Sequence, residues 1–441
     1  MSLSLPEWLR FVEAHPHDFT IQYPVRREYF LQNFRRTPAP RAQDWLSDAT
    51  DALLYLHIPF CEAKCFYCNF AVDVSADAKI HVGYVDALLR ELDGHVGWLD
   101  RTKIRGIDIG GGTPTRLPAK QLARICQAIA PFTQDSGHSF PVSIETTPRI
   151  ASQEPEKLDV LSRGGVQRVS MGVQSFNAAT LALVNRRRQV EQTEQAMTNL
   201  RAAGFRRLNL DIIFGLPGQT MQDWLADLDR VIALSPDSIT TYDCLYRGKG
   251  RALTKIAPTI PTPAEYGAMY DAGYARLTQA GWQAPYGSVN FSRQPDETGT
   301  SACFEGRLLD GLPYLGLGNY ASSLRDNHWS FNAYSVGDYV QRINTDQNPC
   351  EYYYDLPQSE AQAKYLLYSL NYGFIDEGRF LRRFGLTLES AYPQELDYAH
   401  SAGLMQKVGP RWQVMPSRFD RMHLIRGLFY PDTAKTWLLN L

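Results

Sequence analysis

The chain has 441 residues and a formal net charge of −2, with 44% hydrophobic and 21% charged residues. This composition is typical of a globular protein that can bury a large core. The near-neutral charge gives no general attraction to nucleic acid or to an anionic membrane, so neither is expected as a partner. A small or medium-sized organic substrate is the better expectation.

The first 30 residues mix charged and apolar side chains and contain no continuous apolar core of the kind found in signal peptides. No segment approaches the roughly 18 uninterrupted apolar residues of a membrane span. The seven cysteines are an odd count, which argues against a secreted disulfide framework and favours reduced thiols or metal ligation. We therefore expect a cytoplasmic protein.

Three regions are predicted along the chain. Residues 1–50 form an N-terminal extension, whose aromatic residues we expect to pack on the main body rather than to act as a lid. Residues 51–345 form the core with its substrate-side loops, and residues 346–441 form a small, mainly helical C-terminal domain. The helical pattern of that domain covers Ser359–Tyr372, Arg379–Gly385, Leu388–Ala402 and Ser417–Leu428.

From residue 51 onward, short apolar runs alternate with segments of helical periodicity, which is the pattern of βα units around a parallel sheet. Six such units are too few for a closed eight-stranded barrel. The predicted fold class is therefore α/β, a partial (β/α)6 barrel with its active site at the carboxyl ends of the strands. The strands are expected at Leu53–Ile58, Gly106–Gly110, Val142–Thr146, Gln167–Gly172, Arg207–Ile212 and Ser238–Asp243.

The helices between these strands are expected at Tyr84–Leu99, Lys120–Ala130, Ala178–Leu183, Gln189–Ala203 and Met221–Leu234. Gly204 marks the end of the fourth of them. A further helix is predicted at Tyr266–Ala280, followed by a loop-rich region over Tyr286–Ser323.

Three cysteines, Cys61, Cys65 and Cys68, lie in the loop after the first predicted strand. Structural zinc takes four protein ligands, whereas a 4Fe-4S cluster on three cysteines leaves one iron open to a ligand. The alternative is a zinc site completed by a neighbour such as His57. The remaining cysteines are scattered and are interpreted as small buried hydrophobic residues: Cys126, Cys244, Cys303 and Cys350.

Further polar and glycine positions follow later strands. Gly110–Thr115 follows the second strand, where absent side chains let the backbone approach a ligand, although a tight turn is the alternative. Glu145, Gln174 and Asp211 lie at the ends of the third, fourth and fifth strands, and each acid could instead cap a helix. Because the carboxyl ends of parallel strands meet at one edge, these residues indicate one ligand site.

The spacing of Cys61, Cys65 and Cys68, with Tyr67 before the third cysteine, resembles that of the radical S-adenosylmethionine (SAM) superfamily. The resemblance implies a 4Fe-4S cluster whose open iron chelates the amino and carboxylate groups of SAM. It further implies one-electron cleavage of SAM to methionine and a 5′-deoxyadenosyl radical, which takes a hydrogen atom from the substrate. A low-potential electron donor such as flavodoxin or ferredoxin is then expected.

Residues 53–343 resemble the branch of this superfamily typified by the oxygen-independent coproporphyrinogen III oxidase, with the heme chaperone HemW, anaerobic heme-degrading enzymes and certain methyltransferases. The most specific segments are His57–Cys61, Gly110–Thr115, Ser170–Gln174 and Asp211–Pro217. Some members bind two SAM molecules, so one or two are expected. Arg186 is one of the residues that the resemblance assigns to SAM binding; the alternative interpretation is a solvated surface arginine. The resemblance implies SAM contacts from Tyr55, Tyr67, Gly111, Gly112, Thr113, Glu145, Gln174, Arg186, Asp211 and Leu245.

Two segments depart from this pattern. The oxidase has a further cysteine two residues after its cluster motif, where this chain has Phe70, as in HemW and the methyltransferases. Tyr320 and Ser322 stand where HemW-type relatives have a histidine and smaller residues, which indicates a changed substrate pocket or ordinary loop packing. His57 and His328 could ligate heme iron, but a lone histidine is more often a hydrogen-bonded structural residue.

The favoured function is a radical SAM enzyme that acts on a tetrapyrrole, by decarboxylation or by attack on heme. The first alternative is a methyltransferase that uses two SAM molecules on an aromatic or heterocyclic carbon. The second alternative is a heme chaperone without turnover. Substrate contacts are expected from the N-terminal extension, from Tyr286–Ser323 and from the C-terminal domain.

Overall fold

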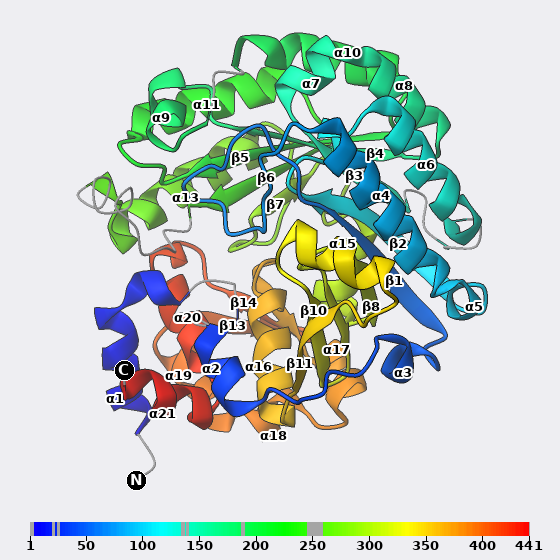
Figure 1. Cartoon of the computed structure of the whole chain (residues 1–441). Helices are drawn as coiled ribbons and strands as arrows, with labels where there is room; N and C mark the ends of the chain where they lie inside the picture. Colours follow the sequence, from blue (N-terminus) through cyan, green and yellow to red (C-terminus); the bar gives the residue numbers. More distant parts are fainter. Residues whose placement is uncertain are drawn as a thin grey trace.

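The computed structural model describes residues 4–19, 23, 27–133, 137, 141–186, 190–244 and 259–440. An eleven-stranded sheet crosses the molecule in the order β11-β10-β9-β8-β1-β2-β3-β4-β5-β6-β7 (Figure 1). The strands are β1 (Asp51–Ile58), β2 (Lys103–Gly111), β3 (Val142–Thr146), β4 (Arg168–Gln174), β5 (Arg207–Phe214), β6 (Ser238–Asp243), β7 (Asn290–Ser292), β8 (Tyr314–Leu317), β9 (Ser322–Arg325), β10 (His328–Asn332) and β11 (Cys350–Asp355).

Strands β1 to β6 are parallel neighbours in chain order. Each of the six predicted runs overlaps one of these strands, and the predicted α/β class with a partial barrel is confirmed. β1 illustrates the reason, because six of its eight residues are buried. A strand covered on both faces is a nearly continuous apolar run, which is easily recognised in a sequence.

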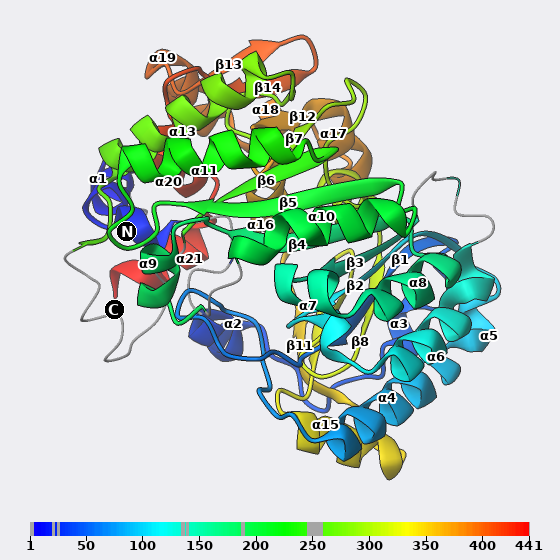
Figure 2. The ribbon, with the colours of Figure 1, turned by 90° about the horizontal axis from the view of Figure 1, so that it is seen from above.

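Both ribbon views show α4, α6, α8, α10 and α11 following one another along the outer side of these strands (Figures 1 and 2). The predicted bounds of α9 and α11 agree with the structure, whereas the predicted helix Tyr84–Leu99 is divided into α4 and α5. The helices of this half are α4 (Ala78–Asp93), α5 (Val96–Leu99), α6 (Ala119–Ile129), α7 (Pro148–Gln153), α8 (Pro155–Arg163), α9 (Ala178–Leu183), α10 (Thr193–Ala202), α11 (Met221–Leu234) and α13 (Pro263–Gln279).

Tyr286–Ser323 is predicted to be loop-rich, but it also contains strands of the sheet. These strands lie at both edges of the group formed by β1 to β6. β7 pairs with β6, and β8 lies parallel to β1 with Leu53 opposite Tyr314. These strands are short and β8 contains a glycine, so their periodicity is weak. The region also contains α14 (Ala302–Glu305) and a π-helical turn, η6 (Gly306–Asp310).

β11 pairs with β10, so the sheet continues past residue 345, and the proposed domain division there stays a prediction.

The C-terminal part is mainly helical, with a small sheet of β12 (Phe374–Asp376), β14 (Arg411–Val414) and β13 (Met405–Val408). Within the described ranges, no helix combines the length and apolar character that a bilayer crossing requires. The remaining helices are α1 (Leu5–Ala14), α2 (Arg27–Asn33), α3 (Gln43–Leu46), α15 (Val336–Asn344), α16 (Gln358–Ser369), α17 (Glu377–Phe384), α18 (Leu388–Ala391), α19 (Pro393–Ser401), α20 (Met422–Leu428) and α21 (Asp432–Leu439).

The two ends of the chain lie near each other in both ribbon views (Figures 1 and 2). Trp8 is fully buried, and its Nε1 donates a 2.8 Å hydrogen bond to the carbonyl of Gly427. Buried Glu360 on α16 accepts hydrogen bonds from the hydroxyls of Tyr23 and Tyr29 in the extension and from Thr433 on α21. The extension therefore packs on the C-terminal helices, as its aromatic residues predict.

We expect Glu360→Ala to lower the free energy of unfolding by about 2 kcal/mol or more, because it leaves the hydroxyls of two buried tyrosines, Tyr23 and Tyr29, without their shared acceptor. Glu360→Gln, which keeps an acceptor, should lose less. Urea unfolding measures the change, with Glu156→Ala on the exposed face of α8 as the matched control. Equal unfolding midpoints for Glu360→Ala and the control would contradict this account.

Candidate functional site

A cavity of about 700 Å³ lies at the carboxyl ends of the parallel strands. It is lined by the loops that follow these strands, by α2 of the N-terminal extension, and by the segment from α14 to β10. The structure brings almost all of the predicted site residues to this one cavity; Leu245 lies outside the described residues. The residues brought together are Tyr55, Cys61, Cys65, Tyr67, Cys68, Gly111, Gly112, Thr113, Glu145, Gln174, Arg186 and Asp211.

The cysteine loop begins where Pro59 follows β1. Its ends are tied together, because Cys61 N donates to Asp73 O at 2.9 Å and Asp73 N donates to Pro59 O at 2.9 Å. Cys61, Cys65 and Cys68 are unbridged and half-buried, and all three line the cavity. One short loop thus presents three sulfur donors to one space.

Two other elements contact these sulfurs. Thr113 Oγ1, after β2, lies 3.5 Å from Cys61 Sγ. Arg186 Nη1, after α9, donates to Cys65 Sγ at 3.8 Å and to the Tyr67 hydroxyl at 3.2 Å. The guanidinium also donates to the carbonyl of Gly172 at the end of β4, so Arg186 is not a solvated surface arginine. Its positive charge is suited to balancing thiolates.

The three thiols match the three-cysteine ligation of a 4Fe-4S cluster, whereas a structural zinc site would need a fourth ligand. His57, the candidate fourth zinc ligand, has both ring nitrogens in contact with oxygen atoms, at 3.1 Å from the Tyr55 hydroxyl and 3.1 Å from Ala71 O. Burial lowers the pKa of His57 to about 4, so its ring is neutral. His57 is a hydrogen-bonded structural residue.

Glycine is needed at positions 111 and 112 because neighbouring atoms leave no room for a side chain. A Cβ on Gly111, whose φ is +117°, would lie 2.6 Å from the His57 ring, and a Cβ on Gly112 would lie 2.6 Å from Pro59 O. The missing side chains therefore let β2 approach the start of the cysteine loop. Gly111 N donates to Glu145 Oε2 at 3.1 Å, which links β2 to the end of β3.

Two partly buried carboxylates, Glu145 and Asp211, lie at the strand ends. Burial, together with Asp211 and Asp108, raises the pKa of Glu145 to about 8. Asp211 accepts hydrogen bonds from Ser170 Oγ at 2.9 Å and Asn209 Nδ2 at 2.8 Å, yet burial still raises its pKa. This end of the cavity favours a positively charged ligand group, because such a group would let these acids ionise.

None of the three polar strand-end residues caps the following helix. The N-cap side chains of α7, α9 and α11 are Thr147, Asn177 and Thr220, respectively. Gln174 instead adopts a left-handed conformation with φ of +73°, where the pairing of β4 with β5 shifts register. The helix-cap interpretation is therefore wrong for Glu145 and Asp211.

The rest of the cavity is largely aromatic and contains two arginines, Arg27 and Arg307, that are not among the predicted site residues. Neither arginine belongs to a recognisable motif. Phe70, Tyr320 and Ser322, where the sequence departs from its relatives, also line the cavity. His328 lies 2.5 Å from the Tyr353 hydroxyl and is not among the cavity-lining residues, so it is not positioned to ligate heme iron there. The aromatic lining consists of Tyr23, Phe30, Tyr55, Tyr67, Phe70, Tyr242, Phe304, Tyr314, Tyr320, Trp329, Phe331, Tyr354 and Tyr368.

Comparison with known proteins gives consistent matches. Residues 55–231 match the radical SAM superfamily. The chain is 30% identical over 305 residues to the oxygen-independent coproporphyrinogen III oxidase of Escherichia coli, covering 67% of this chain and 66% of that enzyme. It is 32% identical over 285 residues to the heme chaperone HemW of Synechocystis sp., covering 62% of this chain and 66% of that protein. The chain thus spans slightly less than two thirds of these relatives.

The structural comparison covers more of the chain than the sequence comparisons do. The solved structure of coproporphyrinogen III oxidase (HemN) from Escherichia coli, a radical SAM enzyme, superposes with a TM-score of 0.75 and 25% identity. The match covers 90% of this chain and 95% of that chain. The chain belongs to the radical SAM superfamily, in the branch that includes coproporphyrinogen III oxidase and the heme chaperone HemW.

Proposed function

We propose that this protein binds a 4Fe-4S cluster on Cys61, Cys65 and Cys68, cleaves SAM reductively, and acts on a tetrapyrrole. The observation that carries the proposal is that three free thiols, the partly buried strand-end carboxylates Glu145 and Asp211, and many aromatic side chains line one cavity. When bound, the cluster would supply the electron that cleaves SAM to methionine and a 5′-deoxyadenosyl radical.

The chain's own residues would hold SAM between the cysteine loop and the strand ends. Glu145 and Asp211 offer negative charge to the cationic part of SAM, and the backbone after Gly111 lines the same space. Arg186 would offset the negative charge of the cysteine thiolates, because its guanidinium contacts Cys65. The further proposed SAM contacts are Tyr55, Tyr67, Gly112, Thr113, Gln174 and Leu245.

The aromatic half of the cavity supports a flat, conjugated substrate, since ring faces stack favourably on such a surface. The names of the relatives point the same way, because one group oxidises coproporphyrinogen III and the other is a heme chaperone. Enclosure of the substrate on the cluster side would keep water from a reactive intermediate. A tetrapyrrole is therefore the substrate class that we propose.

A second candidate, a methyltransferase that uses two SAM molecules, is favoured by one observation. Phe70 is 56% exposed and lines the cavity at the position where the oxidase has its further cysteine. An apolar ring there offers no thiol for proton or hydrogen transfer. Heme binding without turnover is the third outcome that the relatives support.

One anaerobic experiment separates these functions. Reconstituted protein is incubated with SAM, with dithionite in place of the low-potential electron donor, and with coproporphyrinogen III or heme. We expect 5′-deoxyadenosine together with a changed tetrapyrrole. Carbon dioxide indicates decarboxylation, and S-adenosylhomocysteine indicates methyl transfer. Stoichiometric heme binding without 5′-deoxyadenosine would replace the enzyme proposal with a chaperone.

Replacing any one of Cys61, Cys65 or Cys68 by alanine should abolish 5′-deoxyadenosine formation and lower the iron and sulfide content, because each thiolate is a proposed cluster ligand. Cys126→Ala on α6 is the matched control, since Cys126 is buried and is not among the cavity-lining residues. Near-normal SAM cleavage by a variant of the first three would refute the cluster assignment. Loss of iron from Cys126→Ala would implicate a different sulfur.

Glu145 should make SAM binding pH-dependent. Its pKa is raised to about 8, so its neutral form dominates below that pH, and the carboxylate that attracts a cation accumulates as the pH rises. The ratio of wild-type to Glu145→Gln affinity should therefore increase about tenfold from pH 6.5 to 8.5. Calorimetric titration of both proteins measures it, and the ionisation of SAM itself cancels in the ratio. A ratio that does not change with pH would exclude Glu145 as a SAM contact.

A further inference from the structure

Arg307 lines the aromatic half of the cavity from the π-helical turn η6. Such turns are rare and often occur at functional sites. The guanidinium carbon lies 5.5 Å from the Phe304 ring centre and 5.4 Å from that of Tyr314. Among the residues that the structure describes, Arg307 forms no ion pair and its Nε has no hydrogen-bond partner. A cation held against aromatic rings is thus left without a counter-charge in contact.

Two further basic side chains, Lys364 and Arg383, lie behind Arg307. Lys364 and Arg383 line a small cavity of about 10 Å³ that Arg307 also lines, with Asp326 as the acid of that group. Lys364 Nζ lies over the Tyr368 ring at 4.2 Å. Burial lowers the pKa of Lys364 well below its usual range, with smaller contributions from Arg307 and Arg383, so the Lys364 amine is neutral and supplies no counter-charge to Arg307.

Arg27 brings a second guanidinium to the same cavity from α2. Its guanidinium carbon lies 4.0 Å from the Tyr352 ring centre and 5.6 Å from that of Tyr320. Its buried Nη2 has no hydrogen-bond partner, and no ion pair of Arg27 occurs within the described ranges. Stacking on the tyrosine rings and a hydrogen bond to Tyr354 hold this cation in place, and Nη2 is the donor left without a partner.

The acids that line the cavity do not neutralise the two arginines. Glu62 is ion-paired with Arg149 at 2.5 Å, and Asp243 lies 3.8 Å from Arg426. The other two, Glu145 and Asp211, lie on the strand ends beside Gly111 and Ser170. Asp108 attracts Arg307 electrostatically, but it accepts a 2.7 Å hydrogen bond from Ser301 Oγ and forms no ion pair with Arg307 within the described ranges. Neither arginine is therefore ion-paired in the part of the chain that the structure describes, and both can bind negative groups of a ligand.

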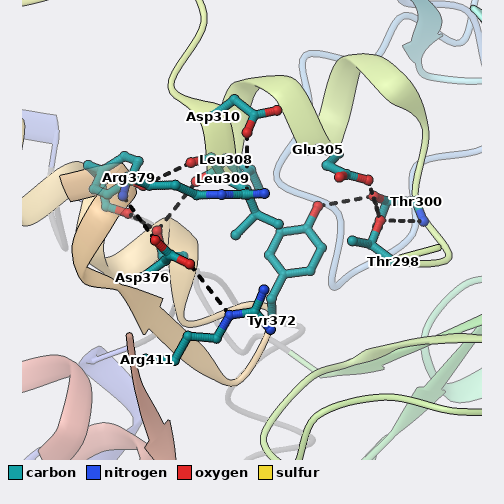
Figure 3. A network of polar contacts seen from close by, with 12 residues as sticks. Thr298, Thr300, Glu305, Leu308, Leu309, Asp310, Tyr372, Asp376, Arg379 and Arg411 are labelled. Carbon is teal, nitrogen blue, oxygen red and sulfur yellow. Dashed lines mark hydrogen bonds and ion pairs between the residues drawn. The ribbon is translucent and has the colours of Figure 1, made fainter. Parts of the chain in front are cut away.

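The C-terminal helices hold the turn that carries Arg307. Figure 3 shows Asp310 of η6 beside Arg379 of α17, an ion pair of 3.4 Å, and the Tyr372 hydroxyl 3.0 Å from Thr300 Oγ1. The carbonyl of Leu309 accepts a 2.8 Å hydrogen bond from the Tyr365 hydroxyl of α16. Contacts at several points of the turn fix the direction of its side chains, so the guanidinium is preorganised rather than free to turn away.

We propose that Arg27 and Arg307 bind two carboxylate groups of a flat polycarboxylic acid whose ring system lies against the aromatic walls. Guanidinium and carboxylate groups form paired, charge-assisted hydrogen bonds, which set both affinity and orientation. The proposal rests on the proposed function and narrows its substrate to an acid with at least two carboxylates. The edge of the ring system opposite the two bound carboxylates is then directed toward the cysteine loop.

The test measures ligand binding to anaerobic, cluster-loaded protein by fluorescence titration. The probes are coproporphyrin III, its tetramethyl ester, and naphthalene-2,6-dicarboxylate as a smaller flat diacid. Arg307→Gln and Arg27→Gln are compared with Arg163→Gln, whose side chain is 81% exposed on α8. Each of the first two should weaken binding of the acid about tenfold or more and leave binding of the ester unchanged. Arg163→Gln should change neither.

Arg307→Lys keeps the charge but not the paired geometry, so it should bind the acid more weakly than wild type and more tightly than Arg307→Gln. Unchanged acid binding in Arg307→Gln, or equal losses for acid and ester, would overturn the carboxylate site while leaving the tetrapyrrole proposal intact. Arginine-dependent binding of the naphthalene diacid without porphyrin binding would support the carboxylate site and reject the tetrapyrrole. Failure of the wild-type protein to bind any probe would reject both.

Discussion

The parallel pairing of β1 with β2 is the constraint on which the site depends. The pairing runs to the last residue of β1, where Ile58 lies opposite Gly111. It then continues beyond the strand, because Gly112 N donates to Ile58 O and Thr113 N donates to Phe60 O, both at 2.8 Å. The backbone after β2 is thereby bonded to the start of the cysteine loop. Any side chain at Gly111 or Gly112 would push the two segments apart and move the thiols.

Charge is distributed unevenly along the cavity. Glu145 and Asp211 lie on the strand ends, whereas Arg27 and Arg307 lie among aromatic rings contributed by other parts of the chain. A ligand pair in which one molecule carries positive charge and the other carries carboxylates would complement both groups. The cavity could then distinguish SAM from the substrate by charge before any shape-specific contact forms.

Much of the fold could be predicted because its determinants are local. The six parallel strands are apolar runs, and Asn177 and Thr220 cap α9 and α11 at the predicted starts. The cysteine spacing and the strand-end position of Glu145 identified one edge of the sheet in the same way. These signals need only a short window of sequence.

The remaining parts depend on contacts between distant segments. β7 and β8 are three and four residues long, too short for a clear alternation. Arg27 and Arg307 are 280 positions apart and meet the cavity only because α2 packs beside β11 and η6 packs under α16. No local pattern distinguishes these arginines from the many that are solvated on the surface.

The contacts between the two ends of the chain have a consequence for biosynthesis. Tyr23 and Tyr29 bond to Glu360, and Trp8 bonds to Gly427, so residues 8–29 cannot dock until the helices that carry Glu360 and Gly427 have been synthesised. The wall that carries Arg27 is therefore completed after the βα units, which can fold earlier as synthesis proceeds. Until then the cavity lacks the part of its wall that Tyr23, Arg27 and Phe30 contribute.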